Sequence, residues 1–205
     1  MIRDKTDLTI SDRIAQRVRD LRADRGMSLG ALAARCGVSR SMISLIERGE
    51  TSPTAVVLEK LATGLNVTLA SLFEPVHAAS DPVARLAQQA LWRDPHSGYV
   101  RRNVSPLSAN AISGTRLASP IQIVEVSFPA NARVAYENGA REAQVHQQIW
   151  ILEGAMQITV GDEDYRLNCG DCLALVLDRP VTFYNATGEL ARYAVVITKL
   201  PFSAR

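Results

Sequence analysis

Three histidines and three cysteines limit the chemistry that this 205-residue chain can carry out. An open catalytic site for iron or manganese needs a set of histidines together with a carboxylate. Here His77, His96 and His146 are dispersed along the chain. Cys169 and Cys172 form a C-x-x-C pair, but neither a second ligand pair nor a helix after the first cysteine is evident, as zinc or redox chemistry would need. We therefore expect these cysteines to be structural.

An arginine-rich stretch offers a different chemistry, contact with phosphate. Between Ser11 and Arg48 the sequence holds eight arginines and four acidic residues, although the formal net charge of the whole chain is only +2. A local basic surplus dominated by arginine suits nucleic-acid phosphates. A solvated helical face with ion pairs four residues apart has the same composition, so charge alone leaves both interpretations open.

The composition predicts a folded protein outside the membrane. Hydrophobic residues make up 47% and charged residues 21% of the sequence, enough to bury a core. No apolar stretch approaches the roughly 18 residues that cross a bilayer, and the first seven residues lack the apolar core of a signal peptide. Three cysteines are too few for a disulfide framework. We therefore expect a cytoplasmic protein without membrane contact.

The arginines fall on short segments with helical periodicity, each flanked by residues that begin or end helices. The predicted N-caps are Ser28, Ser39, Ser52 and Thr68, and Ser52 precedes a proline, which is favoured at the first helical position. Glycines follow most of the apolar repeats. The pattern predicts an all-α domain of five short helices over residues 9–74.

The second and third predicted helices flank a tight turn at Cys36-Gly37-Val38, as in a helix-turn-helix. In that motif the second helix enters the major groove of DNA, and the residues at its N-terminal end meet base edges. Ile43 and Ile46 must hold the helix on the core, which leaves its polar residues outward. Arginine can bind guanine, serine can bind bases or phosphates, and leucine can contact a thymine methyl. The predicted contacts with double-stranded DNA are Ser28, Ser39, Arg40, Ser41, Ser44, Leu45, Arg48, Thr51 and Ser52, together with the N-terminus of the fourth helix.

A long run of spaced matches over about residues 9–74 resembles the helix-turn-helix module of the lambda-repressor or xenobiotic-response-element (XRE) family. The strings Gly37-Val38-Ser39-Arg40-Ser41 and Ile43–Gly49 are among these matches. The resemblance implies a DNA-binding regulator of transcription that reads a specific operator.

Two residues depart from the family pattern, and a third suggests an ion pair. Leu29 stands where the family usually has a glutamine that braces a phosphate, and Leu45 replaces a commonly polar residue. Glu47 resembles the family glutamate that pairs with an arginine of the first helix. We expect that arginine to be Arg17.

From about Leu91 the pattern changes to the two-residue alternation of strands, with turn residues about every ten positions. Residues 75–89 are the predicted linker, with a short helix from Val83 to Gln89. Residues 90–199 are predicted to form an antiparallel sandwich or barrel. The fold class is therefore α + β in two domains. The predicted strands are 121–128, 149–152, 156–160, 172–177, 182–184 and 191–198.

This second region resembles the cupin domain, a small antiparallel jelly-roll barrel. Gln147–Gly154 corresponds to the first cupin motif, and Leu167–Asn185 contains the second. A helix-turn-helix followed by a cupin resembles a large group of bacterial transcription regulators. The resemblance implies a domain that senses a small molecule or holds two chains together.

The residues that hold metal in catalytic cupins are replaced here. Gln147 or Gln148 stands at the position of the metal-binding glutamate, and Val181 at that of the last histidine. His146 does not fall at either of the two histidine positions of the first motif. A neutral amide and a valine do not hold iron or manganese, so we expect no metal, no cofactor and no enzymatic activity. The alternatives are a cupin metalloenzyme (oxygenase, epoxidase or isomerase) and a cupin that only dimerises.

A small antiparallel barrel can hold one small ligand inside, since its side chains alternate between interior and exterior. Phe183 and Tyr193 are further candidates for the wall of such a cavity, and Arg101 or Arg102 could orient an anion. An aromatic residue in a strand is, however, more often part of an ordinary core. The predicted ligand-binding residues are Tyr136, Arg141, His146, Gln148, Trp150 and Tyr184.

Together these patterns predict a homodimeric transcription regulator with a small-molecule effector. A dimer would place two helix-turn-helix units in successive major grooves of a near-palindromic operator. The effector would change the spacing or mobility of these units.

Overall fold

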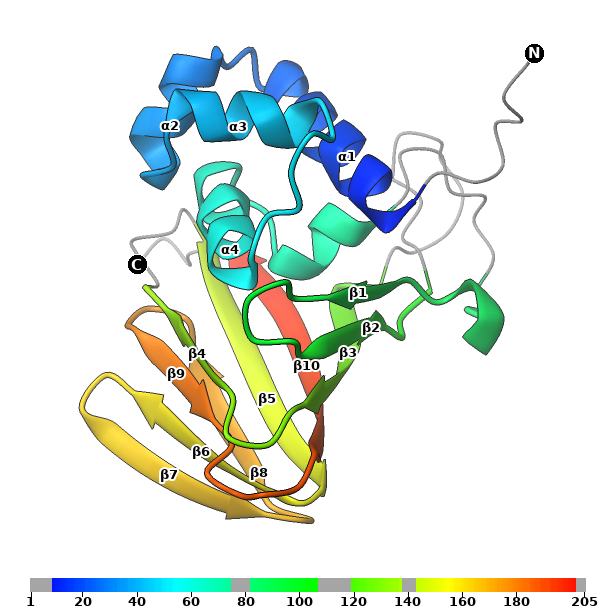
Figure 1. The fold of residues 1–205 in the computed structure, drawn as a ribbon, viewed down its shortest axis with the longest axis vertical. Coiled ribbons are helices and arrows are strands. Elements are labelled where there is room, and N and C mark those ends of the chain that lie inside the picture. The colour runs from blue at the N-terminus through cyan, green and yellow to red at the C-terminus, as the bar shows by residue number, and fades with distance from the viewer. Residues whose placement is uncertain (1–8, 75–81, 107–118, 138–142, 202–205) are drawn as a thin grey trace.

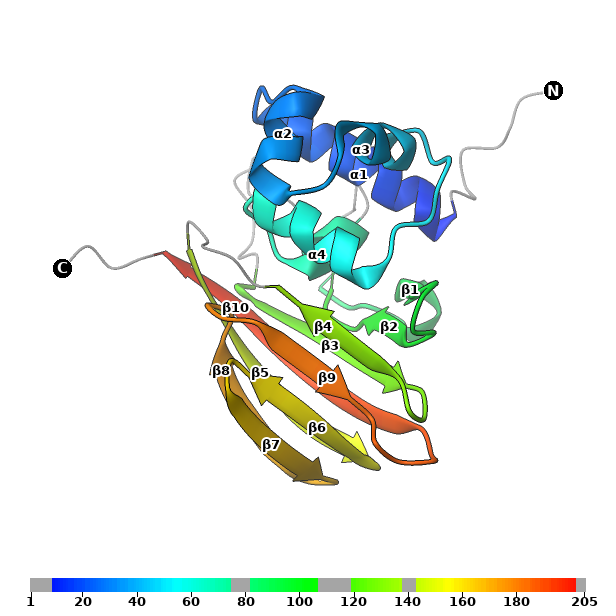
Figure 2. The ribbon, with the colours of Figure 1, turned by 60° about the vertical axis from the view of Figure 1, so that its left-hand side comes forward.

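The computed structural model describes residues 9–74, 82–106, 119–137 and 143–201. They form a helical domain (residues 9–74) that packs on one end of a β-domain (residues 91–201), as Figures 1 and 2 show. Within the described residues no single helix is long and apolar enough to cross a membrane; only the pair α2 (Leu29–Cys36) and α3 (Arg40–Glu47), bent by 115°, passes that test when taken together.

The helical domain contains α1 (Ile10–Asp24), α2 (Leu29–Cys36), α3 (Arg40–Glu47), α4 (Ala55–Gly64) and the 3₁₀ helix η1 (Leu69–Phe73). Four of the five predicted helices are therefore α-helices, and the five-helix prediction is not confirmed, because the last segment is only a 3₁₀ helix. Apolar residues at helical spacing meet in the core, where Ile14, Val18 and Leu32 are almost completely buried.

Serine and threonine caps begin these helices, as their chemistry predicts. Ser28 accepts a hydrogen bond from the Ala31 amide at 3.1 Å, and Ser39 accepts one from the Met42 amide at 3.2 Å. The turn between α2 and α3 requires a left-handed residue, which is Gly37 with φ of 66°.

The predicted cap of the fourth helix is wrong by two residues. The N-cap of α4 is Thr54, whose hydroxyl accepts a hydrogen bond from the Val57 amide at 3.4 Å, rather than Ser52. The proline after Ser52 thus lies before the helix and not in its first turn. Thr54 caps the helix locally, and the first amide of α4, from Ala55, also donates to Asp94 of the β-domain at 2.9 Å.

In the described residues, the β-domain contains ten antiparallel strands. A six-stranded sheet has the order β1-β2-β3-β10-β5-β8, and a four-stranded sheet has the order β4-β9-β6-β7. The two sheets face each other, but the described strands do not close into the predicted barrel. Their bounds are β1 Leu91–Arg93, β2 Val100–Asn103, β3 Ile121–Phe128, β4 Arg133–Tyr136, β5 Ala143–Glu153, β6 Ala155–Val160, β7 Glu163–Asn168, β8 Cys172–Val176, β9 Val181–Tyr184 and β10 Ala191–Pro201.

The two domains share one continuous hydrophobic core. Phe73 of η1 packs on Trp92 of β1, with ring centroids 5.5 Å apart, and Trp92 in turn meets Tyr99 at 5.8 Å. Residues 75–81 of the predicted linker lie outside the described residues; in its described part, the predicted short helix is the 3₁₀ helix η2 (Leu86–Gln88).

Candidate functional site

The outward face of α3 is turned away from the β-domain. In Figures 1 and 2, α2 and α3 lie on the far side of the helical domain, and α4 lies between them and the sheets. Ser39, Arg40 and Ser41 are exposed at the N-terminal end of α3, and Ser44 and Leu45 are half-buried. The spacing of positions 41, 44, 45 and 48 places them along one side of the helix.

One exposed residue of α3 escaped the sequence analysis. Met42 is 37% exposed, although Ile43 beside it is completely buried. Its flexible thioether adds an apolar surface to the edge of the candidate interface. The helical periodicity could have identified it, since Met42 is one of the residues that Ile43 and Ile46 leave outside the core.

The serine caps at the start of α2 and α3 leave hydrogen-bond donors for an anion. Each serine oxygen accepts from its own helix, and the hydrogen bond between Ser39 and Ser41 uses one of their two hydroxyl protons, which leaves the other to donate outward. Ser39 and Ser41 place their hydroxyl oxygens 3.2 Å apart. The N-terminus of a helix favours negative charge, so the start of α3 is electrostatically suited to a phosphate.

Arg48 is exposed but already paired. Its guanidinium donates to both carboxylate oxygens of Glu50, at 2.6 and 2.8 Å, and also to the Ser44 hydroxyl. The hydrogen bond to Glu50 raises the pKa of Arg48 and lowers that of Glu50. Contact with a phosphate would therefore have to compete with an acidic neighbour that the sequence analysis did not consider.

The Glu47 ion pair exists, but the predicted partner is wrong. Glu47 accepts hydrogen bonds from Arg22, Nε to Oε1 at 2.6 Å and Nη2 to Oε2 at 2.8 Å. Arg22 lies in the last turn of α1, where the end of α3 crosses it, whereas Arg17 turns toward η1 and pairs with Glu74. Glu47 thus fixes α3 on α1, and its hydrogen bond raises the pKa of Arg22.

The N-terminus of α4, predicted as a phosphate site, is instead attached to the β-domain. Asp94 is only 2% exposed. Its Oδ1 accepts from the Ala55 amide, and its Oδ2 accepts from the amide and hydroxyl of Ser97 at 2.7 and 2.6 Å. Thr51 is half-buried and Ser52 exposed in the segment before α4.

A second candidate site is a cavity of about 50 Å³ where the helical domain meets the β-domain. Its wall is mostly apolar, with a cluster of polar groups at one end. Glu59 of α4, and Thr68 and Leu69 at the start of η1, come from the helical domain. The remaining wall residues, from the two sheets, are Tyr99, Arg101, Val126, Tyr136, Val145, Gln147, Leu177, Val181, Phe183, Tyr193, Val195 and Ile197.

Five of the six predicted ligand-binding residues are described, and of these five only Tyr136 lines this cavity. On β5, Gln147 points inward, and the alternation of the strand therefore turns His146, Gln148 and Trp150 to the opposite face. Tyr184 lies outside for the same reason beside Phe183, with its ring under the guanidinium of Arg133, and Arg141 lies outside the described residues. The three other wall candidates Phe183, Tyr193 and Arg101 do line the cavity, whereas Arg102 pairs with Glu125.

Three tyrosines place hydroxyl groups in or next to the cavity. The hydroxyl oxygens of Tyr99 and Tyr136 lie 3.1 Å apart. Burial raises the pKa of Tyr99 to about 12 and raises the pKa values of Tyr136 and Tyr193 well above their usual range. These hydroxyls are therefore neutral and can donate hydrogen bonds.

Arg101 and Glu59 are the two charged residues in the cavity wall, and Arg101 is 6% exposed. Its Nε donates to Asn103 at 3.4 Å, and its guanidinium lies over the ring of Phe73, 5.4 Å from the centroid. Its Nη2 has no hydrogen-bond partner among the described residues. Burial lowers the pKa of Arg101, and the surrounding tyrosines and Glu59 oppose that shift. Arg101 was predicted as a residue that could orient an anion, but the sequence pattern does not indicate that its side chain points inward.

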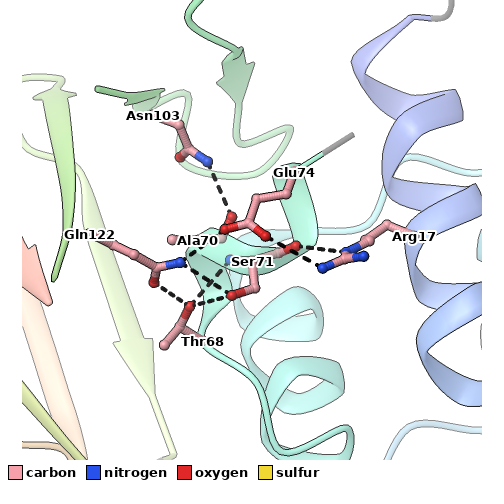
Figure 3. Close-up of polar contacts among 7 residues, drawn as sticks. All are labelled: Arg17, Thr68, Ala70, Ser71, Glu74, Asn103 and Gln122. Carbon is pink, nitrogen blue, oxygen red and sulfur yellow. Dashed lines mark hydrogen bonds and ion pairs between the residues drawn. The ribbon is translucent and has the colours of Figure 1, made fainter. Parts of the chain in front are cut away.

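A polar network beside the cavity ties the helical domain to β2 and β3 (Figure 3). Gln122 of β3 accepts a hydrogen bond from Thr68 at 2.6 Å and donates to Glu74 at 3.1 Å. Glu74 is paired with Arg17 at 3.4 Å, and Arg17 also donates to the Ser71 carbonyl at 3.2 Å. The carbonyl of Ala70 accepts from Asn103 at 3.1 Å. η1 is thus held from both sides.

Metal ligands do not gather in the described part of the chain, where no group of three or more His, Cys, Asp or Glu side chains could hold an ion. Cys169 and Cys172 are exposed free thiols, and the Cys169 thiol donates to the Leu152 carbonyl at 3.2 Å. Cys36 is buried between α2 and the rest of the helical core, and burial raises its pKa.

The outer face of the six-stranded sheet carries a groove of about 500 Å³ that contains His146 and Gln148. Around it lie apolar side chains from neighbouring strands. Trp150 is 51% exposed, and Ile121 is 47% exposed. Val196 of β10 pairs with Ile123 on one side and with Gln148 on the other. A single apolar surface therefore crosses β3, β10 and β5.

Comparison with known proteins agrees with the geometry of the helical domain. The helix-turn-helix family HTH_3 matches residues 18–72. The chain is 29% identical to the HTH-type transcriptional regulator SutR of Escherichia coli over 186 residues, which are 88% of this chain and 91% of SutR. It is 36% identical over 55 residues to y4dJ of Sinorhizobium fredii, an uncharacterized HTH-type transcriptional regulator; these residues are 27% of this chain and 71% of y4dJ.

A solved structure is similar over both domains. The HTH_3 family transcriptional regulator from Vibrio cholerae matches with a TM-score of 0.72 and 26% identity, covering 92% of this chain and 96% of that one. The similarity thus includes the β-domain as well as the helix-turn-helix. The chain therefore belongs to the XRE (HTH_3) family of DNA-binding, helix-turn-helix transcriptional regulators.

Proposed function

We propose that the protein is a cytoplasmic transcription regulator that recognises a specific operator through α3 and responds to a small effector in its β-domain. The observation that carries the first part is the outward face of α3, which begins with exposed Ser39, Arg40 and Ser41 on the side away from the sheets. Side chains at this end of a recognition helix meet base edges in the major groove.

Substitution of Arg40 by alanine tests the reading of bases. Arg40→Ala should weaken binding to the operator by about 1–3 kcal/mol and relax the base preference at one position. The operator is first selected from random duplexes with the wild-type protein. Arg166→Ala on β7 is the matched control, since it removes the same charge from an exposed residue in the β-domain. An equal loss of affinity for random DNA would show that Arg40 only contacts phosphate.

We propose that the outer face of the six-stranded sheet joins two copies of the chain. Exposed Trp150, Ile121 and Ile123 support this proposal, since large apolar patches on a sheet are typical of interfaces. A closed dimer presents two copies of α3 to a near-palindromic site. Trp150→Glu should therefore convert dimers to monomers in sedimentation experiments and abolish cooperative binding to the two half-sites. A wild-type monomer at micromolar concentration would contradict the proposal.

The effector part of the proposal is supported by the cavity, because its wall includes α4 and η1 of the DNA-binding domain. A ligand there contacts both domains and can favour one arrangement of them over another. The competing metalloenzyme would hold stoichiometric iron or manganese after purification. Metal analysis together with a turnover assay would decide between these two functions.

A further inference from the structure

We propose that the effector is a small organic carboxylate, bound by Arg101 and the neighbouring tyrosine hydroxyls and covered by α4 and η1. This inference rests on the proposed effector site and adds the chemical class of the ligand and the way in which the site is closed.

The unsatisfied hydrogen-bond donor of Arg101 points to an anion. A buried guanidinium normally has partners for its donors, because an unpaired charge inside a protein is costly. Here Nη2 has no partner among the described residues, while the aromatic ring of Phe73 and the amide of Asn103 hold the rest of the group in place. A carboxylate matches the planar fork of arginine.

The hydroxyl groups next to Arg101 favour the same class of ligand. Tyr99 and Tyr136 form a pair whose oxygens are 3.1 Å apart, and Tyr193 lines the same wall. One shared proton can join the first two hydroxyls, which leaves the other proton available to a carboxylate oxygen. Gln147 of β5 adds an amide to the wall of the same cavity.

The size and apolar lining of the cavity limit the rest of the ligand. A volume of about 50 Å³ has room for roughly four water-sized groups. Valine, leucine and isoleucine make up seven of the fifteen wall residues, and Phe183 adds an aromatic ring, so the remainder of the ligand should be a short hydrocarbon. Acetate, propionate and butyrate have this form, whereas a six-carbon acid should be too long.

The lid comes from the DNA-binding domain. Glu59, Thr68 and Leu69 close one side of the cavity. Thr68 is also bound to Gln122 in the polar network, and Phe73 at the other end of η1 lies against Arg101. A ligand on Arg101 therefore touches the elements that set the position of the helical domain.

Titration of the full chain with propionate tests the ligand class. Propionate should raise the melting temperature of the protein by several degrees, whereas propionamide and propylammonium, which have the same size, should not. Hexanoate should bind at least tenfold more weakly than propionate. Equal binding of propionamide or propylammonium would overturn the carboxylate assignment, and so would the absence of any response to the three short acids.

Substitution of Arg101 separates a ligand-binding arginine from a structural one. Arg101→Met should leave the melting temperature of the ligand-free protein unchanged or higher, and should abolish the response to propionate. Arg102→Met is the matched control on the same strand, and it should retain the full response. Tyr136→Phe removes a single hydroxyl and should weaken propionate binding several-fold. A fall in stability of Arg101→Met with propionate binding intact would overturn the proposal.

DNA binding distinguishes the failure of this inference from that of the proposed function. Linkage requires that propionate change the operator affinity by the same factor by which the operator changes propionate affinity. If propionate binds without any change in operator affinity, the result supports the anion site and contradicts the effector role. If a neutral compound changes operator affinity in both the wild type and Arg101→Met, the result supports an effector role for the β-domain and contradicts the carboxylate inference.

Discussion

The helical domain uses its helix N-termini in opposite ways at its two ends. At the outer end, α2 and α3 are capped by their own exposed serines, Ser28 and Ser39. At the inner end, the first amide of α4 is bound to Asp94, a buried carboxylate of the β-domain. A helix N-terminus that faces solvent can bind a phosphate, whereas one whose amide is bound to a protein carboxylate holds the helix against the segment that carries this carboxylate. One end of the domain is therefore available to DNA, and the other is a joint.

Ion pairs repeat this contrast. Arg48 and Glu50 are exposed at the outer end, where an ion pair contributes little to stability and is screened by salt. Arg17 and Glu74 are mostly buried at the inner end, within the network of Gln122 and Ser71. Changes at the outer end should thus act on DNA binding, and changes at the inner end on the joint between domains.

Loss of the aromatic contact at the joint should have the largest effect. Phe73 is 1% exposed and packs on Trp92 and Arg101. Phe73→Ala should destabilise the protein by about 3–5 kcal/mol and separate the unfolding of the two domains. Helical circular dichroism and Trp92 fluorescence, measured in a Trp150→Phe background, should give coincident transitions in the parent protein and different ones in the variant. Different transitions in the parent protein would contradict a shared core, and coincident transitions in the variant would show that Phe73 does not couple the two domains.

Removal of one cap at each end compares the two uses of helix N-termini directly. Asp94→Ala leaves the buried Ala55 amide unpaired and should cost about 1.5–3 kcal/mol. Ser39→Ala at the outer end should cost about 0.5–2 kcal/mol. Hydrogen exchange measured by NMR should show loss of protection at Ala55 only in the first variant and at Met42 only in the second. Loss of Ala55 protection in both would mean that the two ends are not independent.

Capping chemistry and helical periodicity made most of the helical domain predictable, because both act between residues close in sequence. Thr9, Ser28 and Ser39 cap helices that their neighbours can satisfy locally. The N-terminus of α4 was predictable only in part, because Thr54 caps it locally but its first amide is bound by Asp94, a residue distant in sequence. Local signals cannot contain such a partner.

The cavity was predictable only in part, because its residues depend on strand register. Phe183 and Tyr136 were identified by type, but type alone does not tell which face of a strand points inward. A shift by one residue moves every side chain to the other face, and this is the difference between Gln147 and Gln148. β2 and β7 were missed because Arg101, Arg102 and Glu163 are not typical strand residues.

A smaller effect is expected where Glu50 competes with DNA for Arg48. Glu50→Gln removes a negative charge next to the predicted phosphate contact and should raise operator affinity by about 0.2–1 kcal/mol. If Arg48 then binds a phosphate, the slope of log affinity against log salt should steepen by about one. Affinities over a salt series measure both quantities. Glu163→Gln on β7 is the matched exposed control; an equal gain in that variant would show a nonspecific charge effect.

The smallest effect concerns pH, and two carboxylates at the joint predict opposite signs. Burial raises the pKa of Glu74 above its ordinary value of 4.5, so the folded state binds more protons than the unfolded state just above that value. Its contribution to stability is therefore full below 4.5 and is lost as the pH rises through the raised pKa. The hydrogen bond from Lys60 lowers the pKa of Glu137, so its contribution is present above 4.5 and is lost as the pH falls.

Substitution of each carboxylate by its amide should reveal these two signs. Relative to the wild type, Glu74→Gln should gain stability as the pH rises from about 4.5, and Glu137→Gln should gain it as the pH falls. Urea unfolding at a series of pH values measures both. The change should be clearer for Glu74, because water screens the exposed Glu137 pair. If the difference in unfolding free energy between Glu74→Gln and the wild type does not change with pH, the contacts of Glu74 with Arg17 and Gln122 fully offset the effect of burial on its pKa. Glu74 would then make no pH-dependent contribution to the stability of the joint.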